Sequence, residues 1–324
     1  MMRLTAGIVA AALACAPLAA LVLPARAQAQ TLIEDPRYAA ILIDIDAGEV
    51  LYERRADLLR HPASITKVMT LYLAFDALEA GRLRLDDRVE MTPAAVRQPP
   101  SKIGLGLGQS ISVEQAIRLI AVKSANDMAV ALAERIAGTH GQFVELMNRR
   151  AAELGMTRTS FANASGLPHP DNLTTARDIA TLAQQLILNH GPRYRYFSEQ
   201  FVDWQGRPLA NHNRLLGRVV GVDGIKTGFT TASGYTLVAS ARRDDRRLVA
   251  VVLGSPTGAV RDANITALIE AGFGVVRARE RGQRFTVASL LGEPAEFTPS
   301  DQIGALIEQG SAEQGSSEQG SRPD

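Results

Sequence analysis

The stretch YTLVASARRDDRRLVAVVL, from Tyr235 to Leu253, decides the fold class of this chain of 324 residues. Two runs rich in branched apolar residues, Tyr235–Ala241 and Leu248–Leu253, flank the charged segment Arg242–Arg247. Strand-forming runs on either side of a short polar turn predict a β-hairpin. The hairpin lies late in the chain, and a stable sheet needs further strands.

A second hairpin is predicted near the N-terminus. Ala39–Asp44 and Glu49–Arg54 are the candidate strands, and Asp46-Ala47-Gly48 is the turn between them. Between the two hairpins, apolar residues recur at helical spacing over 64–79, 113–122, 126–136, 142–154 and 176–189, and a last helix is expected over 263–272. We therefore predict an α+β fold: an antiparallel β-sheet flanked by helices, with a helical subdomain inserted between the N-terminal and C-terminal strands.

The N-terminus has the pattern of a secretory signal. Arg3 precedes the apolar run Leu4–Leu23, and small residues at Ala25 and Ala27 follow. This pattern predicts a signal peptide over residues 1–27 and a folded domain over 28–275, with the mature protein exported to the periplasm or another extracytoplasmic part of the cell envelope. A retained membrane anchor is the alternative, although Pro17 and Pro24 interrupt the run.

The C-terminal extension, 276–324, is expected to be largely a disordered tail. After about Glu293 the composition turns polar, and Glu-Gln-Gly-Ser recurs at Glu308, Glu313 and Glu318. Such a segment buries too little apolar surface to fold. No amphipathic helix follows, so no C-terminal membrane anchor is predicted.

Composition excludes several classes of function. Loss of the signal with Arg3 and Arg26 changes the formal net charge from +1 to −1, which does not favour binding to nucleic acid. Cys15, the single cysteine, lies in the signal, so neither a disulfide nor thiol chemistry is expected in the exported protein. The function must therefore be sought in a site of other residues.

Ser64-Ile65-Thr66-Lys67 is the first candidate for chemistry. Residues at i and i+3 share one helix face, so the Lys67 amine can reach the Ser64 hydroxyl. A serine needs a base to become a good nucleophile, and a lysine can serve where burial or neighbouring cations lower its pKa. By itself this pattern is more often a helix N-cap followed by a solvated lysine.

Two further triplets follow in the chain. Ser124-Ala125-Asn126 lies between two predicted helices, and Lys226-Thr227-Gly228 lies beyond the break at Asp223-Gly224. Each triplet alone has an ordinary structural explanation. In the order Ser-x-x-Lys, Ser-x-Asn, Lys-Thr-Gly, however, the three form the signature of penicillin-binding proteins and class A β-lactamases.

With these motifs the sequence resembles the D-alanyl-D-alanine carboxypeptidase family of low-molecular-mass penicillin-binding proteins, which are Ser-x-x-Lys serine peptidases. The resemblance covers about residues 38–273, and it implies a β-lactamase/transpeptidase-like fold. Other matches are Pro62-Ala63, Asp127, Ala164-Ser165-Gly166-Leu167, Val222-Asp223-Gly224-Ile225, Gly254, Arg261 and Gly272-Phe273.

The resemblance implies a serine-type D-Ala-D-Ala carboxypeptidase. It would remove the terminal D-alanine from peptidoglycan stem pentapeptides through an acyl-enzyme on Ser64, with β-lactam antibiotics as covalent inhibitors. Lys67 would be the base, and Ser124 and Lys226 would complete the proton path. Asn126 would hold the substrate backbone. The Lys226-Thr227-Gly228 strand also supplies substrate contacts: the N–H groups of Ser64 and Phe229 would form the oxyanion hole, and Thr227 and Arg261 would bind the terminal carboxylate.

Phe229 departs from the pattern, since some relatives carry histidine after Lys-Thr-Gly. Three other functions share this motif set. A D-alanyl endopeptidase that cuts peptidoglycan cross-links uses the same residues. A β-lactamase of class A needs a Glu-x-x-Leu-Asn loop that the sequence lacks, and a non-catalytic binder of peptidoglycan or β-lactam would not need all five motif residues.

Other motifs are expected to be structural. Gly104-Leu105-Gly106-Leu107-Gly108 follows no strand and lacks nucleotide-binding spacing, so it predicts a loop. The five histidines, His61, His140, His169, His190 and His212, have no metal-ligand spacing, so neither a metal site nor a cofactor is expected.

Overall fold

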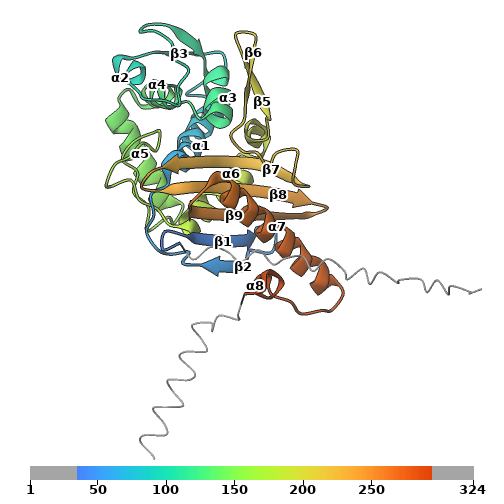
Figure 1. The fold of residues 1–324 in the computed structure, drawn as a ribbon. Helices are drawn as coiled ribbons and strands as arrows, with labels where there is room; N and C mark the ends of the chain where they lie inside the picture. Colours follow the sequence, from blue (N-terminus) through green and yellow to red (C-terminus); the bar gives the residue numbers. More distant parts are fainter. Residues whose placement is uncertain (1–34, 294–324) are drawn as a thin grey trace, which may run out of the picture.

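A computed structural model describes residues 35–293 of the chain, and its centre is a five-stranded antiparallel sheet in the order β2-β1-β9-β8-β7 (Figure 1). The strands are β1 (Ala39–Asp44), β2 (Glu49–Arg54), β7 (Val222–Thr230), β8 (Gly234–Arg243) and β9 (Arg246–Ser255). The first and last of the described strands thus meet within the sheet, where β1 pairs with β9. Strand β7 is an edge strand, with one side free of ladder hydrogen bonds.

The central strands are apolar on both faces because the sheet is covered on both sides. Along β1, Ala39, Ile41 and Ile43 pack into one apolar cluster, and Ala40 and Leu42 pack into another. Alternate side chains point to opposite faces of a strand. The two clusters are therefore the two layers of the core.

One face of the sheet carries the helical block that is inserted between β2 and β7 (Figure 1). Helix α1 (Thr66–Glu79) is buried along nearly its whole length, and α6 (Ala176–Asn189) packs beside it against β1 and β9. The rest of the block comprises η1 (Ala63–Ile65), β3 (Arg88–Glu90), α2 (Pro93–Val96), β4 (Ser110–Ser112), α3 (Val113–Lys123), α4 (Asn126–Ala137), α5 (His140–Glu153), η2 (Gly191–Phe197), β5 (Phe201–Trp204) and β6 (Arg207–Ala210).

The opposite face is covered by α7 (Gly258–Glu280) and α8 (Val287–Leu291) (Figure 1). Gly272 lets α7 approach the sheet closely, because a Cβ there would lie 2.6 Å from Leu42 Cδ2 and 2.8 Å from Leu248 Cδ1. The layer order is thus helices, sheet, helices.

The predicted fold class is confirmed, and several boundaries need correction. Helix α7 continues to Glu280, and α8 buries Val287 and Leu291 against the sheet, so the expected boundary at 275 falls inside a helix. The charged turn is shorter than predicted, because Arg242 and Arg243 pair with Arg247 and Arg246 in the ladder. The predicted signal peptide, residues 1–27, and the repeats after Glu293 lie outside the described residues. Within residues 35–293, no helix is both long and apolar enough to span a bilayer.

Candidate active site

The candidate nucleophile Ser64 lies in η1, the turn that leads into α1. Ala63 has a φ of 49°, an uncommon value for a residue other than glycine, and it packs against two glycines. A Cβ on Gly166 would lie 1.8 Å from the Ala63 carbonyl oxygen, and a Cβ on Gly228 would lie 2.9 Å from the Ser64 nitrogen. The loop at Gly166 and strand β7 therefore contact the turn from two sides and fix the position of Ser64.

Lys67 lies one helical turn further on and is completely buried. Its Nζ is 3.1 Å from Ser64 Oγ and also donates to Asn126 Oδ1 at 2.7 Å and to the Ser165 carbonyl oxygen at 2.5 Å. A neutral amine has two N–H donors and one lone pair. The two carbonyl-type acceptors occupy both donors, so the lone pair is left for the Ser64 hydroxyl.

The electrostatics favour a neutral Lys67. Burial lowers its pKa well below the ordinary value, the nearby charge of Lys226 lowers it further, and Asp127 opposes the shift. Lys226 is itself buried, and burial together with the charge of Arg261 lowers its pKa to about 7. Desolvation disfavours an ammonium ion, and a second cation nearby disfavours it again.

The second triplet lies where α3 ends and α4 begins. Ser124 caps α3 in the left-handed conformation (φ 61°, ψ 34°), so the chain turns sharply and Asn126 begins α4. The Asn126 amide donates to the Pro99 carbonyl oxygen at 2.9 Å while its Oδ1 accepts from Lys67. One of its two N–H donors remains for a ligand.

The third triplet forms the opposite wall of the same cleft. Lys226, Thr227 and Gly228 lie on the edge strand β7, and Lys226 Nζ donates to the Thr227 carbonyl oxygen at 3.0 Å. The next residue, Phe229, is 53% exposed, and its ring packs on Tyr235 with centroids 4.3 Å apart. Because β7 is an edge strand, its unpaired N–H groups point towards the cleft.

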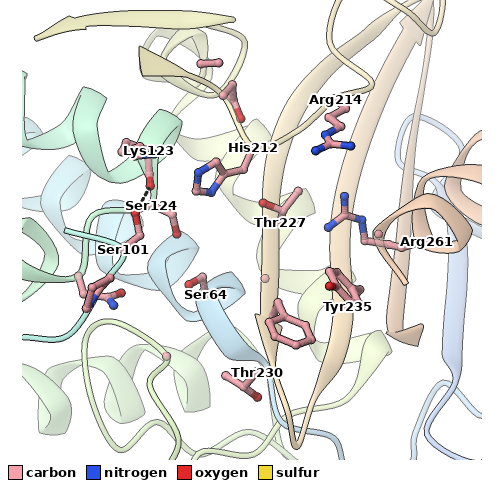
Figure 2. Close-up of a pocket in the computed structure, with 18 of the residues that line it drawn as sticks. Ser64, Ser101, Lys123, Ser124, His212, Arg214, Thr227, Thr230, Tyr235 and Arg261 are labelled. Atoms are coloured by element: carbon pink, nitrogen blue, oxygen red, sulfur yellow. Dashed lines mark hydrogen bonds between the residues drawn. The ribbon is translucent and has the colours of Figure 1, made fainter. Parts of the chain in front are cut away.

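A cleft of about 960 Å³ joins these elements, and Figure 2 shows Ser64 between Ser124 on one side and Thr227 on the other. Ser124, Asn126, Thr227, Gly228, Phe229 and Arg261 all line it with Ser64. Lys67 and Lys226 lie beneath its surface. The structure thus brings all nine residues predicted from the sequence to one place.

Arg261 lies in the first turn of α7 and points into the cleft beside Thr227 (Figure 2). Its guanidinium donates to Asp262 Oδ1 at 2.9 and 2.6 Å. The side chain is only 8% exposed, so the carboxylate partner holds the guanidinium in a fixed orientation.

Several residues of the site were missed from the sequence. Arg214 and His212 reach the cleft from the segment before β7, and Tyr235 reaches it from β8 (Figure 2). None of them belongs to a motif, and their approach depends on tertiary contacts. The Ser165 carbonyl was also missed as a ligand of Lys67, although the Ala164–Leu167 match gave a signal.

The other sequence motifs have structural roles. The glycine-rich segment is a loop, as predicted, and Asp127 accepts hydrogen bonds from the backbone N–H groups of Ile103 and Gly104 at its start. No cluster of three potential metal ligands occurs within residues 35–293. His190 is buried beside Asp76 and Glu79, and His140 accepts from the Ala164 N–H.

An antiparallel sheet between two helical layers, with a Ser–Lys pair set between a buried helix and an edge strand, defines the penicillin-binding-protein class of fold. The family model for D-alanyl-D-alanine carboxypeptidases matches residues 27–257. The chain belongs to this family of serine peptidases, as the motifs predicted.

Comparison with individual relatives supports the same family assignment. The chain is 37% identical over 243 residues to the D-alanyl-D-alanine carboxypeptidase DacF of Bacillus subtilis, which covers 72% of this chain and 61% of DacF. The chain thus spans about three fifths of that relative's length. Penicillin binding protein 5 from Haemophilus influenzae superposes with a TM-score of 0.70 at 36% identity, over 73% of this chain and 70% of that one. A D-alanyl-D-alanine endopeptidase of Escherichia coli is 30% identical over 264 residues, which are 76% of this chain and 83% of the endopeptidase.

Proposed function

We propose that the protein is a serine-type D-Ala-D-Ala carboxypeptidase that removes the terminal D-alanine from peptidoglycan stem pentapeptides. The observation that carries the proposal is the arrangement around Lys67. Its amine is buried, both N–H donors of its neutral form have carbonyl-type acceptors, and Ser64 Oγ lies 3.1 Å away. This arrangement suits a general base and would be unfavourable for a structural ion.

Acylation follows from this arrangement. Lys67 accepts the Ser64 proton as Oγ attacks the carbonyl carbon of the penultimate D-alanine. The N–H groups of Ser64 and Phe229 stabilise the resulting oxyanion, a contribution that is typically worth roughly two to three orders of magnitude in rate for each donor. The C–N bond then breaks, and Ser124 and Lys226 relay the proton to the leaving amine. Water hydrolyses the ester of Ser64 in a second step.

Substrate orientation comes from the two walls. The free N–H of Asn126 binds a backbone carbonyl on the acyl side, while Thr227 and Arg261 bind the carboxylate of the leaving D-alanine. A guanidinium recognises a carboxylate through paired hydrogen bonds, and Asp262 holds this one in place. We therefore expect the cleft to prefer a substrate with a free C-terminus.

We also propose that β-lactams acylate Ser64 and that the protein acts outside the cytoplasm, after cleavage of residues 1–27. Its family acts on the cell wall, and Listeria monocytogenes Penicillin-Binding Protein D2, a solved structure with the same fold, contains bound cefotaxime. N-terminal sequencing of protein from the cell envelope tests the cleavage: a chain that starts near Gln28 is expected, and one that retains Met1 contradicts it.

The decisive assay compares two substrates by mass spectrometry: a muropeptide with a pentapeptide stem and its cross-linked dimer. Loss of one alanine from the monomer is the expected result. Splitting of the dimer alone would identify an endopeptidase instead. Labelling with a fluorescent penicillin, with Ser64→Ala as the control, tests the nucleophile. An unlabelled wild type would favour a non-catalytic binder, and rapid hydrolysis of benzylpenicillin would indicate a β-lactamase.

A further inference from the structure

The cleft carries a positive charge that the reaction described above does not use. Its lining includes the cations of Lys123, Arg214 and Arg261 but a single carboxylate, that of Asp262, which is already bound to Arg261. Lys123 is the last residue of α3, where a cation complements the helix carbonyl groups. The side chain of Arg214 forms no hydrogen bond or ion pair with any residue in the described range 35–293. Its guanidinium is therefore available to a ligand.

The fold fixes the backbone on both sides of Arg214. Asn213 is only 3% exposed, and its side chain donates to the Gly224 carbonyl oxygen at 2.9 Å and accepts from the Leu215 N–H at 3.1 Å. Leu215 and Leu216 are buried in the apolar cluster beneath α7. Arg214 itself is exposed. Its side chain is thus presented to the cleft from a rigid support, so little ordering of the backbone is needed when a ligand binds.

Arg214 lies at the end of the cleft that we assign to the leaving group. Figure 2 shows the guanidinium groups of Arg214 and Arg261 facing each other beside Thr227. The single carboxylate of a leaving D-alanine is matched by Thr227 and Arg261, and its methyl side chain offers nothing to a second guanidinium. A guanidinium pairs best with a carboxylate, through two parallel hydrogen bonds.

We propose that Arg214 recognises a second carboxylate on the leaving residue, so that the cleft favours peptides whose C-terminal residue is an acidic D-amino acid. The inference rests on the proposed function, and the chemistry is the same. An ester forms between Ser64 Oγ and the acyl carbon, the C–N bond breaks, and the leaving amine takes up a proton. The α-carboxylate of the leaving residue lies at Thr227 and Arg261, and its side-chain carboxylate lies at Arg214.

Three peptides with the same acyl part test this selectivity. They end in D-Ala-D-Ala, D-Ala-D-Glu and D-Ala-D-Gln, and the last two are nearly identical in shape but differ by one charge. Mass spectrometry measures the release of the terminal residue by the wild type, Arg214→Gln and Arg218→Gln. Arg218 is the matched control, because it is an exposed arginine of the same segment that does not line the cleft. Thermal unfolding verifies that both variants are folded.

The informative quantity is the ratio of kcat/KM for the D-glutamate peptide to that for the D-glutamine peptide. We expect a ratio of about fivefold in the wild type and in Arg218→Gln, and of less than about twofold in Arg214→Gln, since an exposed ion pair is lost. A wild-type ratio near one, or a ratio that Arg214→Gln lowers no more than Arg218→Gln does, would overturn the inference alone. Failure of the wild type to release D-alanine would overturn the proposed function, and this inference with it.

Discussion

At the scale of the residue, the site depends on a lysine whose surroundings favour its neutral form. In that form the two N–H donors of Lys67 are occupied by Asn126 and Ser165 and the lone pair is left for Ser64, while burial and the Lys226 charge lower the pKa of the amine. The sequence gives the spacing of serine and lysine but not the burial, which depends on contacts with Asn126 and Ser165 far along the chain. The chemistry therefore comes from tertiary structure as much as from the motif.

Replacement of the base tests this arrangement. We expect Lys67→Ala to lower the rate of Ser64 acylation by at least about two orders of magnitude, because no other described side chain hydrogen-bonds to Oγ. The rate is measured with fluorescent penicillin over a time course. Circular dichroism and thermal unfolding serve as the folding control. Acylation at the wild-type rate in a folded variant would remove Lys67 as the base.

The charge of Lys226 should affect the pH dependence of Ser64 acylation. Lys67 must be neutral to accept a proton, so acylation is lost as pH falls through its lowered pKa. Lys226, whose pKa is about 7, is charged below that pH and there depresses the pKa of Lys67. Removing this positive charge in Lys226→Gln raises the pKa of Lys67, so the acid limb of the acylation profile moves to higher pH.

The control for this experiment is Lys102→Gln, which removes an exposed lysine outside the cleft. Its pH profile should coincide with that of the wild type. Because Lys226→Gln also slows the reaction, the informative quantity is the midpoint of the limb and not the rate. A midpoint that stays fixed, or moves to lower pH, would contradict electrostatic coupling of the two lysines.

At the scale of the element, two glycines let three segments meet at the nucleophile. The loop at Gly166 and strand β7 at Gly228 both touch the η1 turn so closely that no side chain fits between them. The individual elements were largely predictable from apolar periodicity, and the sheet and helical insertion followed from their order. The close approaches at Gly166 and Gly228 were not predictable, because the sequence of a loop does not show whether a glycine in it has open or crowded surroundings.

Gly166 and Gly155 separate these two situations in a matched pair. Both have a φ of +78°, but a Cβ at Gly155 would meet nothing within 4 Å, whereas one at Gly166 would collide with the Ala63 backbone. Gly155→Ala should therefore lower the free energy of unfolding by about 1 kcal/mol, because alanine is strained at a positive φ. Gly166→Ala should lower it by more, and should also slow Ser64 acylation by displacing η1. If the two variants lower the free energy of unfolding in urea equally and Gly166→Ala is acylated normally, the close-contact explanation is wrong.

Helix α6 ends at a buried histidine that couples stability to pH. His190 lies 2.9 Å from Glu79 and 3.2 Å from Asp76, and Asp76 also pairs with Arg150. Burial alone lowers the pKa of His190, but hydrogen bonds to Asp76 and Glu79 outweigh it, and the net shift is upward from 6.5. The protonated ring thus stabilises the fold. This contribution is complete below about pH 6.5 and is lost as pH rises through the raised pKa.

We expect His190→Gln to destabilise the protein more in acid than in base. Urea unfolding of wild type and variant at about pH 5.5 and about pH 9 gives the two differences in free energy of unfolding. The difference should be larger at the acid pH, where the wild-type histidine is charged. A difference that is independent of pH would mean that His190 contributes only through its packing on Tyr72 and Phe75.

At the scale of the whole molecule, the catalytic cleft and the C-terminal end of the described fold lie at opposite edges of one sheet. The cleft uses the β7 edge, whereas α8 contacts β2 at the other edge (Figure 1). The sequence could not show that 276–293 belong to the folded layer, because α8 is a single short helix with little periodicity. Its place is set by contacts: Val287 and Leu291 enter the core, and Glu293 accepts a hydrogen bond from Tyr52 at 3.0 Å.

Two truncations isolate this contribution. A chain that ends after Arg281 and one that ends after Glu293 differ only in residues 282–293. We expect the shorter chain to be less stable by about 2–4 kcal/mol, since each buried apolar side chain contributes about 1.5–3 kcal/mol and the ordering of the segment offsets part of this gain. Both chains should be labelled fully by fluorescent penicillin at about 20 °C, because α8 does not line the cleft. Equal unfolding midpoints would show that α8 adds nothing to the fold, and loss of labelling in the shorter chain alone would show that the two edges of the sheet are coupled.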